Sequence, residues 1–478
     1  MALSTALSIA QNSLLNTQRQ TNVVSRNIAN AYNPDYARRT AVLSSLSSGA
    51  QISIISRATD IALRQQNLSA MSGFKAQETI AKSLDWLTLS INGVDNINSP
   101  ATLIGRLQEA LQLYSGNPAN RTIGESAVEA ARDVLRSLND GAAAIRTYRA
   151  EMDHQIATAV NEVNALLAEF KVENDKIVNG TIAGRDTLDA FDRRDAILKQ
   201  IAEYIPISTI GRGNNDLMIV TADGTTLFET IPRNVHFEPV PAYGPSTTGN
   251  VVSIDGVPIS ASHSANTTAV GTLAAMLQVR DSISVTAQSY LDEIARGLVT
   301  AFAETNPGNP ADVRPGLFTW PGAPAMPAAA TLIDGLAGTI TLNPLIDPLQ
   351  GGDPSALRDG ANFDFNPDDN ASFTDLLIGF ATALDNPMDF VNGANVSVMG
   401  FSASAINWID NERKSAAGAA EIKSALMLRT EEALSNVTRV NVDEEMALML
   451  ELEHSYAASA KMMQMIDEML RQLLNIVR

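Results

Sequence analysis

The chain contains no cysteine in its 478 residues, and this absence excludes three kinds of chemistry. Disulfide bonds, thiolate metal sites and cysteine nucleophiles all need the missing side chain. Histidine is scarce as well: the four residues are far apart and lack the spacing of metal ligands, namely His154, His236, His263 and His454. We therefore expect no metal, no other cofactor and no catalytic residue.

Positive charge is also in short supply. The chain has 34 Lys and Arg against 53 Asp and Glu, a formal net charge of −19. Binding to nucleic acid or to an anionic membrane surface depends on clustered Lys and Arg, so we expect neither partner. No stretch reaches the roughly 20 apolar residues that a membrane-spanning helix needs. The first residues lack the basic and apolar regions of a signal peptide, so any export is expected to proceed without a cleaved signal.

Two short motifs that could indicate catalysis are weak. Gly211 and Gly213 begin a phosphate-loop pattern, but Asp216 stands where a third glycine is needed, and a strand follows instead of a helix. Ser72 and Lys75 have the S-x-x-K spacing of some acyl-transfer enzymes, but neither of its companion motifs is present. We interpret both as structural.

One acidic segment has part of a calcium-loop pattern. Asp364, Asn366 and Asp368 take its positions 1, 3 and 5, and Asp375 takes position 12. Asp369 replaces the glycine that the turn at position 6 needs. The segment reads as a solvated acidic loop, and weak calcium binding stays open as an alternative.

The positive signal lies at the two ends of the chain, which both have an apolar repeat of about 3.5 residues. This period places the repeating side chains along one seam of a helix, as in a coiled coil. In the first segment the seam comprises Leu3, Leu7, Ala10, Leu14, Thr17, Thr21, Val24 and Ile28. In the last segment it comprises Val442, Met446, Met449, Glu453, Tyr456, Ala460, Met463, Asp467, Leu470, Leu474 and Val477.

Charge and composition favour pairing between these ends. Residues 1–57 contain five arginines and one aspartate, whereas residues 441–478 contain seven acidic and three basic residues. Opposite charges on two amphipathic helices favour their association. The last helix also has an apolar face too wide for one neighbour, and it is rich in methionine, whose flexible side chain adapts to different partners. We therefore expect assembly rather than catalysis.

The order of the patterns predicts a mainly α chain with β-rich insertions (α+β). Long coiled-coil-type helices form the ends, a helical bundle forms the body, and the β domains lie outermost. We predict a terminal helical polymerisation domain from residues 1–45 and 440–478, and a helical body from residues 46–205, 269–305 and 396–439. Residues 206–268 form a β-rich insertion, and residues 306–395 an irregular β-containing insertion.

Local signals place the elements within these parts. Helices are expected at residues 1–30, over most of 60–204, at 271–304, and from 402 to the end with a break near 436–441. Residues 51–56 read as extended. Asp223-Gly224 and Asp255-Gly256 are turn formers between short apolar runs, so each marks a β-hairpin.

The end of the first helix resembles a known signature. Residues 25–38 are similar to the pattern S-x-N-I-A-N-x-x-T-x-G-Y-x-R of the bacterial flagellar rod, hook and hook-associated axial proteins. The matching residues are Ser25, Asn27, Ile28, Ala29, Asn30, Tyr36 and Arg38. Asn33 replaces the threonine and Asp35 the glycine, so Pro34-Asp35 suits a type I turn better than a type II turn.

Three further segments resemble the hook-associated protein 1 branch of that family: residues 49–65, 192–205 and 440–469. The resemblance implies a structural protein at the junction of hook and filament, with self-assembly in a helical lattice. It implies the hook protein and the next hook-associated protein or the filament as partners. It further implies an extracellular place in the flagellum, export through the flagellar type III apparatus, and a cytoplasmic chaperone at the C-terminal part before export.

On this basis we predict which residues form the assembly interface. They are Leu3, Leu7, Leu14, Val24 and Ile28 of the first helix and Met446, Met449, Tyr456, Met463, Leu470 and Leu474 of the last. Asn27, Asn30, Tyr36 and Arg38 are expected to fix the path of the chain as it leaves the first helix. Two alternatives stay open: another flagellar axial protein of the hook or rod, and a secreted hydrolase with axial-type ends and an active site in residues 306–395.

Overall fold

The computed structural model describes residues 2–46, 49–259 and 270–476, and it confirms a mainly α-helical chain with small antiparallel sheets. Within it the chain forms two compact units, each described by itself. The terminal unit comprises Met1–Met71, Ala165–Arg233 and Ser424–Arg478. The central unit comprises Ser72–Asn164 and Asn234–Lys423. The predicted insertion at 206–268 contributes one small sheet to each unit, and the division into four segments stays a prediction.

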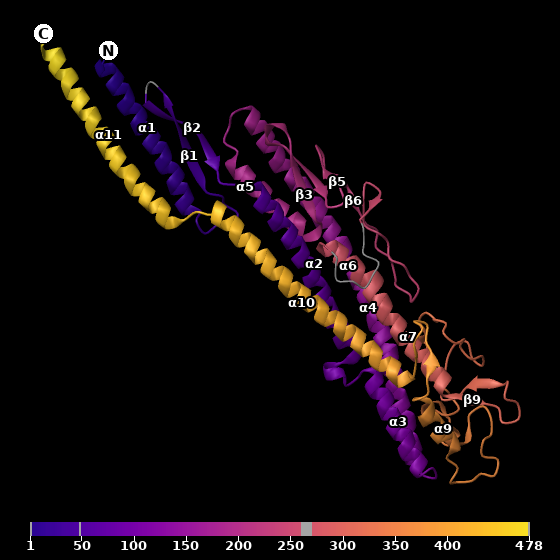
Figure 1. The fold of residues 1–478 in the computed structure, drawn as a ribbon. Helices are drawn as coiled ribbons and strands as arrows, with labels where there is room; N and C mark the ends of the chain where they lie inside the picture. The colour runs from indigo at the N-terminus through magenta and orange to yellow at the C-terminus, as the bar shows by residue number, and fades with distance from the viewer. Residues whose placement is uncertain (1, 47–48, 260–269, 477–478) are drawn as a thin grey trace. The chain divides into compact units, whose positions relative to one another are not determined.

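The terminal unit joins the two ends of the chain. Its helices are α1 (Ala2–Ala29), α5 (Leu188–Tyr204) and α11 (Val442–Ile476), with parts of α2 (Ile61–Asn92), α4 (Arg121–Ile182) and α10 (Val398–Thr438). α1 and α11 lie side by side (Figure 1). They run antiparallel, as two contacts show: Asn27, near the end of α1, meets Glu445 at the start of α11, and the earlier Ser13 meets the later Ser459. The expected break in the last helical segment is confirmed between Thr438 and Val442.

Local sequence explains where these helices begin and end. α1 ends before a turn in which the Tyr36 N–H donates to the Asn33 carbonyl, and Asp35 keeps a negative φ, as a type I turn requires. α11 begins after Asn441, whose side-chain oxygen accepts the Asp443 N–H at 3.1 Å and acts as the N-cap. Three acidic residues in the first turn of α11 complement the positive end of the helix dipole.

Two small antiparallel sheets complete the terminal unit. β1 (Arg39–Leu46) pairs with β2 (Gly49–Arg57), although the sequence indicated only an extended stretch at 51–56. The second sheet has the order β3 (Ile207–Gly211), β4 (Leu217–Thr221) and β5 (Thr226–Phe228). It contains the predicted hairpin around Asp223-Gly224 and one strand, β3, that the sequence analysis missed. Phe228 packs edge-on against Phe170 of α4, with their ring centroids 4.9 Å apart.

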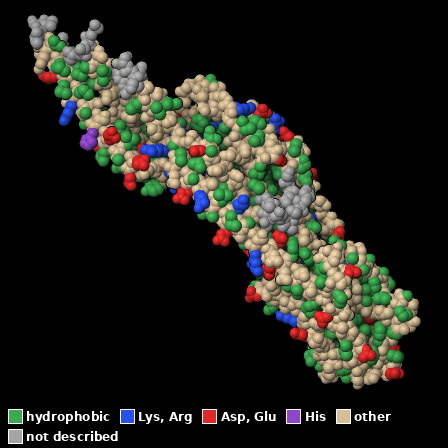
Figure 2. Space-filling view, viewed as in Figure 1, with side chains coloured by type: hydrophobic (Ala, Val, Ile, Leu, Met, Phe, Trp, Pro, Cys, Tyr) green, Lys and Arg blue, Asp and Glu red, His purple; other side chains and the backbone are tan. Residues whose placement is uncertain are grey.

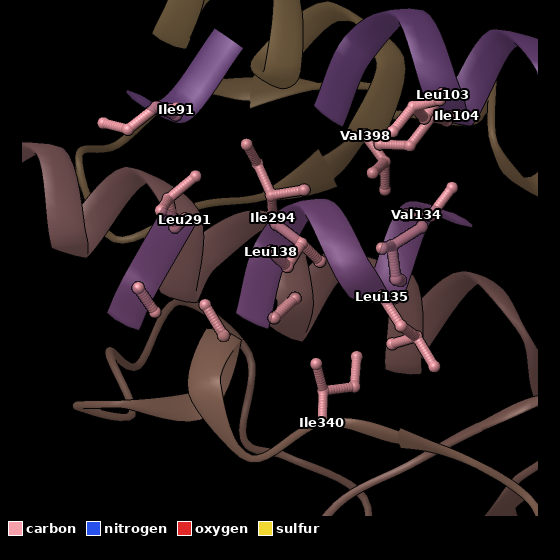
Figure 3. Packing of buried hydrophobic residues seen from close by; sticks show 14 of the residues in the cluster. Ile91, Leu103, Ile104, Val134, Leu135, Leu138, Leu291, Ile294, Ile340 and Val398 are labelled. Carbon is pink, nitrogen blue, oxygen red and sulfur yellow. The ribbon is translucent and has the colours of Figure 1, made fainter. Parts of the chain in front are cut away.

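The central unit is built around a helical core. Its own helices are α3 (Pro100–Gly116), α6 (Thr272–Gln278), α7 (Ser284–Ala301), α8 (Ala356–Asp359) and α9 (Asp375–Ala383). A π-helical turn, η3 (Val279–Ile283), links α6 to α7. Figure 3 shows side chains of α2, α3, α4, α7 and α10 converging in this core, among them Leu103, Leu138 and Ile294, all nearly inaccessible to solvent. The apolar residues that recur with helical spacing in the sequence are the ones that each helix turns toward this core.

The β structure of the central unit consists of short antiparallel pairs. β6 (Val235–His236), β7 (Ser253–Ile254) and β8 (Val257–Pro258) form a three-stranded sheet. Asp255 and Gly256 both have positive φ, as the predicted tight hairpin turn requires. The remaining strands form three pairs in residues 303–396, which are β9 (Ala303–Thr305) with β10 (Val313–Pro315), β11 (Phe318–Thr319) with β12 (Thr341–Leu342), and β13 (Met388–Asp389) with β14 (Asn395–Val396).

The irregular insertion is held by buried carboxylates on α7 and just after it. Each carboxylate accepts backbone N–H groups from a different loop, so the loops are anchored through their main chain. Asp292 accepts from Gly335 and Ala337, both at 2.8 Å, and Glu293 accepts from Val391 at 2.9 Å. Glu304 accepts from Ala361 and Asn362 at 2.9 and 2.7 Å. Buried backbone donors need such partners, which explains how a segment with little secondary structure is ordered.

We predict that Asp292 titrates near pH 6. Burial raises the pKa of this carboxyl to about 6, against the lowering effect of the two backbone N–H groups. In the unfolded chain the pKa of an aspartate carboxyl is about 3.9. The native chain therefore holds one more proton than the unfolded chain between about pH 4 and pH 6. The contribution of Asp292 to stability is therefore complete below about pH 4 and is lost as the pH rises through about 6.

Carboxyl carbon NMR of aspartate-labelled protein checks this prediction. One resonance with a midpoint near 6 is expected, and it should be absent from Asp292→Asn. A titration of that resonance near pH 4 would contradict the raised pKa.

Candidate assembly site at the paired chain ends

The two terminal helices share a buried seam with a seven-residue repeat. On α11 the most buried positions are Glu445, Leu452, Ser459 and Ile466, with Val442, Met449, Met463 and Leu470 half-buried between them. On α1 the corresponding positions are Ala10, Thr17, Val24 and Asn27, with Leu7, Leu14 and Ile28 half-buried. Ser13 and Ser459 meet within the seam with their hydroxyl oxygens 2.8 Å apart. A seven-residue repeat of buried positions is typical of a coiled coil, so α1 and α11 form an antiparallel coiled-coil pair.

The structure places the predicted interface residues in three groups. Leu7, Leu14, Val24, Ile28, Met449, Met463 and Leu470 lie on the faces that α1 and α11 turn toward each other or beside them. Met446 and Tyr456 are 49% and 47% exposed, so within one chain they lie outside the buried seam. The side chains of Leu3 and Leu474, and Val477, lie outside the described residues. A role of these residues between subunits stays a prediction.

The seam read from the 3.5-residue repeat included Met446, Glu453, Ala460 and Asp467, whereas the positions buried within the chain are one residue earlier, at Glu445, Leu452, Ser459 and Ile466. Leu452 and Ile466 belong to the wider apolar face that the sequence predicted for this helix, but Glu445 and Ser459 were missed. Two of the four buried residues are polar, and a search for apolar periodicity passes over them.

The signature residue Asn27 lies at the centre of a buried hydrogen-bond cluster. Its side-chain N–H groups donate to the Arg39 carbonyl at 2.8 Å and to Glu445 at 3.0 Å. Its oxygen accepts from the Tyr36 hydroxyl at 2.8 Å and from the Arg39 N–H at 3.1 Å. An amide has two donors and two acceptor sites, so the hydrogen-bonding capacity of Asn27 is fully used. This cluster connects the end of α1, the start of β1 and the first turn of α11.

Arg38 and Glu445 extend the cluster. The Arg38 guanidinium donates to Glu445 at 2.7 Å and contacts Glu444 at 3.2 Å. The Arg38 N–H donates to the Thr438 carbonyl at 2.7 Å, which fixes the chain at the break between α10 and α11. Glu445 is only 1% exposed, so its carboxylate depends on these two partners. Three signature residues, Asn27, Tyr36 and Arg38, thus perform one structural task.

The other signature residues have separate places. The Asn30 side chain donates to the Arg26 carbonyl at 2.8 Å at the end of α1. Ile28 is half-buried, whereas Ser25 and Ala29 are exposed on α1.

A ladder of four arginines and four aspartates anchors the terminal segments on α5. Arg26 pairs with Asp186 and Asp189, Arg39 with Asp189 and Asp192, Arg57 with Asp192 and Asp195, and Arg64 with Asp195. The arginines come from α1, β1, β2 and α2, and the aspartates recur every three residues, from Asp186 just before α5 to Asp195 within it. We call these eight residues the Arg–Asp ladder.

The ladder corrects the expected direction of the charge complementarity. The sequence analysis assigned the basic N-terminal segment to the acidic last helix. Among the described residues, that pairing occurs only at Arg38, whereas Arg26, Arg39 and Arg57 pair with aspartates of α5, and Arg26 also with Asp186 in the loop before it. The aspartates of α5 lie more than 130 residues from these arginines, so no local pattern links them.

Burial sets the protonation equilibria of the ladder. Burial raises the pKa of the Asp192 carboxyl, although Arg57 and Arg39 lower it. For Asp195 the burial effect is outweighed, and the guanidinium groups of Arg57 and Arg64 bring its pKa below the usual value. Next to the ladder, burial lowers the pKa of Arg194 to about 10. Arg194 donates to Asn174 and to the Asn215 carbonyl, and so ties α5 to α4 and to the loop before β4.

An apolar stripe remains exposed on α11 within the single chain. Met462, Met465, Met469 and Leu473 follow at intervals of three and four residues and are 46%, 58%, 46% and 46% exposed. Figure 2 shows hydrophobic side chains at the surface in this part of the terminal unit, with acidic side chains among them. A contiguous exposed apolar stripe is typical of a protein–protein contact surface.

Several residues considered for catalysis or metal binding are buried or paired with neighbouring side chains. Ser72 is fully buried in α2, Lys75 lies near Glu78, and Arg212 pairs with Asp216. The Asn366 amide is engaged with Asp359 and Asn370 in its own loop. His154, His236 and His454 are exposed, and His263 lies outside the described residues.

Two features are absent from the residues that the structure describes. In that part of the chain, no three His, Asp or Glu side chains are grouped so that they could hold a metal ion. No helix there is both long and apolar enough to cross a membrane.

Comparisons with known proteins add to this geometry. A family model described as the helical domain of flagellar hook-associated protein FlgK matches residues 94–308. A second, described as the C-terminal region of the flagellar basal body rod FlgEFG proteins, matches residues 435–476. Flagellar hook-associated protein 1 of Bacillus subtilis (strain 168) is 22% identical over 513 residues, which cover 98% of this chain and 97% of that protein.

A solved structure is similar in fold. The flagellar hook junction protein FlgK from Burkholderia pseudomallei superposes with a TM-score of 0.58 at 12% identity, covering 77% of this chain and 99% of that one.

We predict that the buried part of the ladder stabilises the terminal unit. Asp192→Ala removes a carboxylate shared by Arg39 and Arg57, and should lower the free energy of unfolding by about 3 kcal/mol, as for other broken buried ion pairs. Asp186→Ala is the matched control: both Asp186 and Arg26 are more than half exposed, so its effect should stay below about 1 kcal/mol. Hydrogen exchange of the α5 amides measures both. Equal effects of the two changes would contradict the assigned role of burial.

Proposed function

Since the chain belongs to the family of flagellar hook-associated protein 1, we propose that it is a structural axial protein forming the junction between hook and filament of a bacterial flagellum. The observation that carries this proposal is the combination of a family-specific helical region at 94–308 with paired terminal helices. The proposal places the protein outside the cell, as part of the flagellum.

The two family matches favour the junction over the hook and the rod. The match at 435–476 is to the C-terminal region of rod-type proteins, so the last helix is a feature shared among axial proteins. The match at 94–308 is to the helical domain of the hook-associated protein and covers most of the central unit's helices. A hook or rod protein accounts for the first similarity but not for the second.

We propose that neighbouring subunits associate through the terminal unit. The exposed methionine stripe of α11 and the exposed Met446 and Tyr456 are the surfaces that the single chain leaves uncovered. The surface of one copy would meet a different surface of the next, because such heterologous contacts generate a helical lattice. The proposed partners are further copies, the hook protein, and the next hook-associated protein or the filament.

The same family membership suggests how the protein is exported and that it has no catalytic role. We propose export through the flagellar type III apparatus, with the C-terminal part bound beforehand by a cytoplasmic chaperone. The methionine stripe suits a temporary partner as well, because methionine side chains adapt to different surfaces. We propose no catalytic role for any residue.

The methionine stripe provides the test of assembly. Met465→Asp combined with Met469→Asp puts two charges on side chains that are exposed in the single chain, so folding should be unaffected. We expect the variant to be exported but not incorporated at the hook tip, with filament subunits shed into the medium from hooks that lack filaments. Gln472→Asp, also exposed on α11, is the control and should support normal filaments.

Complementation of a deletion strain, with electron microscopy of isolated hooks, measures the outcome. Normal filaments with the methionine variant would contradict assembly through this stripe. A deletion strain with normal filaments would contradict the junction function itself.

A further inference from the structure

We propose that two polar contacts in the seam, the buried Asn27–Glu445 pair and the partly buried Ser13–Ser459 pair, set the axial register of α1 against α11, and that Glu445 is the main register residue. The inference deepens the proposed function, because it concerns the helices through which subunits would assemble. It can nevertheless be tested in the single chain, where no assembly is needed.

The apolar part of the seam specifies the register poorly. A shift of one heptad along α11 exchanges Met463 for Leu470, or Val442 for Met449, and so replaces one apolar side chain with another. Methionine adapts its shape to the space available, which weakens the distinction further. Uniform apolar seams allow alternative registers unless a buried polar residue excludes them.

The polar contacts distinguish the native register from its neighbours. Asn27 is fully buried and uses all four of its hydrogen bonds, one of them with Glu445. A shift of one heptad would bring Asn27 opposite Leu452, which has no acceptor. Asn27 would be left as a buried amide with one N–H group lacking an acceptor, and Glu445 would lose both Asn27 and Arg38. An unpaired buried polar group costs free energy, and the loss of the Arg38–Glu445 ion pair adds to that cost.

The second polar contact excludes the same shift independently. Ser13 and Asn27 lie fourteen residues apart on α1, and Glu445 and Ser459 lie fourteen residues apart on α11. Both contacts are therefore satisfied in a single arrangement, two heptads apart along the seam. The shift that brings Asn27 to Leu452 also brings Ser13 to Ile466, so both polar contacts are lost together.

The position of Glu445 makes the register matter for the rest of the terminal unit. Glu445 is in the first turn of α11, and its partner Arg38 is bound through its backbone to Thr438 at the end of α10. The register contact is thus fixed at the break between the two C-terminal helices. A shifted α11 would need to detach from this point.

Engineered cysteines can report the register, because the natural chain has none. In full-length monomer, Ser13→Cys with Ser459→Cys reports the native register and should form a disulfide in high yield. Ser13→Cys with Ile466→Cys reports the shifted register and should form little. We expect Glu445→Leu to lower the native cross-link at least threefold and to raise the shifted one. Glu445→Gln keeps an acceptor for Asn27 and should restore the native cross-link.

The matched control is Glu451→Leu, the same change at an exposed position of α11, which should leave both cross-links unchanged. A native cross-link that persists in Glu445→Leu would overturn the proposal, because the apolar seam would then suffice. Loss of every cross-link would overturn it too, since Glu445 would be needed for pairing rather than for register. Failure of the wild-type protein to join hooks would contradict the proposed function without changing either cross-link yield.

Discussion

The need to give every buried charge a partner governs the terminal unit. Four arginines from four different elements approach one face of α5, and each buried guanidinium is stable there only because an aspartate of the ladder lies beside it. The same constraint applies to Glu445, which depends on Asn27 and Arg38. Polar pairing therefore fixes the path of the chain from α1 through the β1–β2 hairpin to α2. The apolar seams pack within the arrangement that these polar contacts define.

Within this frame, the two faces of the terminal helices have different tasks. The inner face of α11 combines polar contacts that demand one arrangement with apolar contacts that accept several. The outer face carries flexible methionines without such demands. The proposed assembly with further copies and with different neighbours would benefit from this division, because the chain keeps one internal geometry while its outer surface adapts.

Sequence reasoning recovered the features that arise from local periodicity and lost those that depend on distant contacts. The terminal helices, the break before α11 and the hairpin at Asp255-Gly256 are all encoded by neighbouring residues. Glu445 and Ser459 were missed because an apolar repeat assigns no buried place to a carboxylate or a hydroxyl. The ladder was missed because its partners are far apart in the chain. Net charge predicted the sign of the attraction but not the helix that provides it.

The anchoring of the irregular insertion through Asp292, Glu293 and Glu304 has a consequence for how freely that region can vary. The loops bind these carboxylates mainly through main-chain N–H groups, which nearly every amino acid supplies, although the Asn362 side chain also donates to Glu304 at 3.1 Å. Substitutions in the loops therefore leave the anchors intact as long as proline does not remove a donor. The region is suited to rapid divergence of its outer surface, and peptide tags or foreign epitopes could be placed between the anchor points.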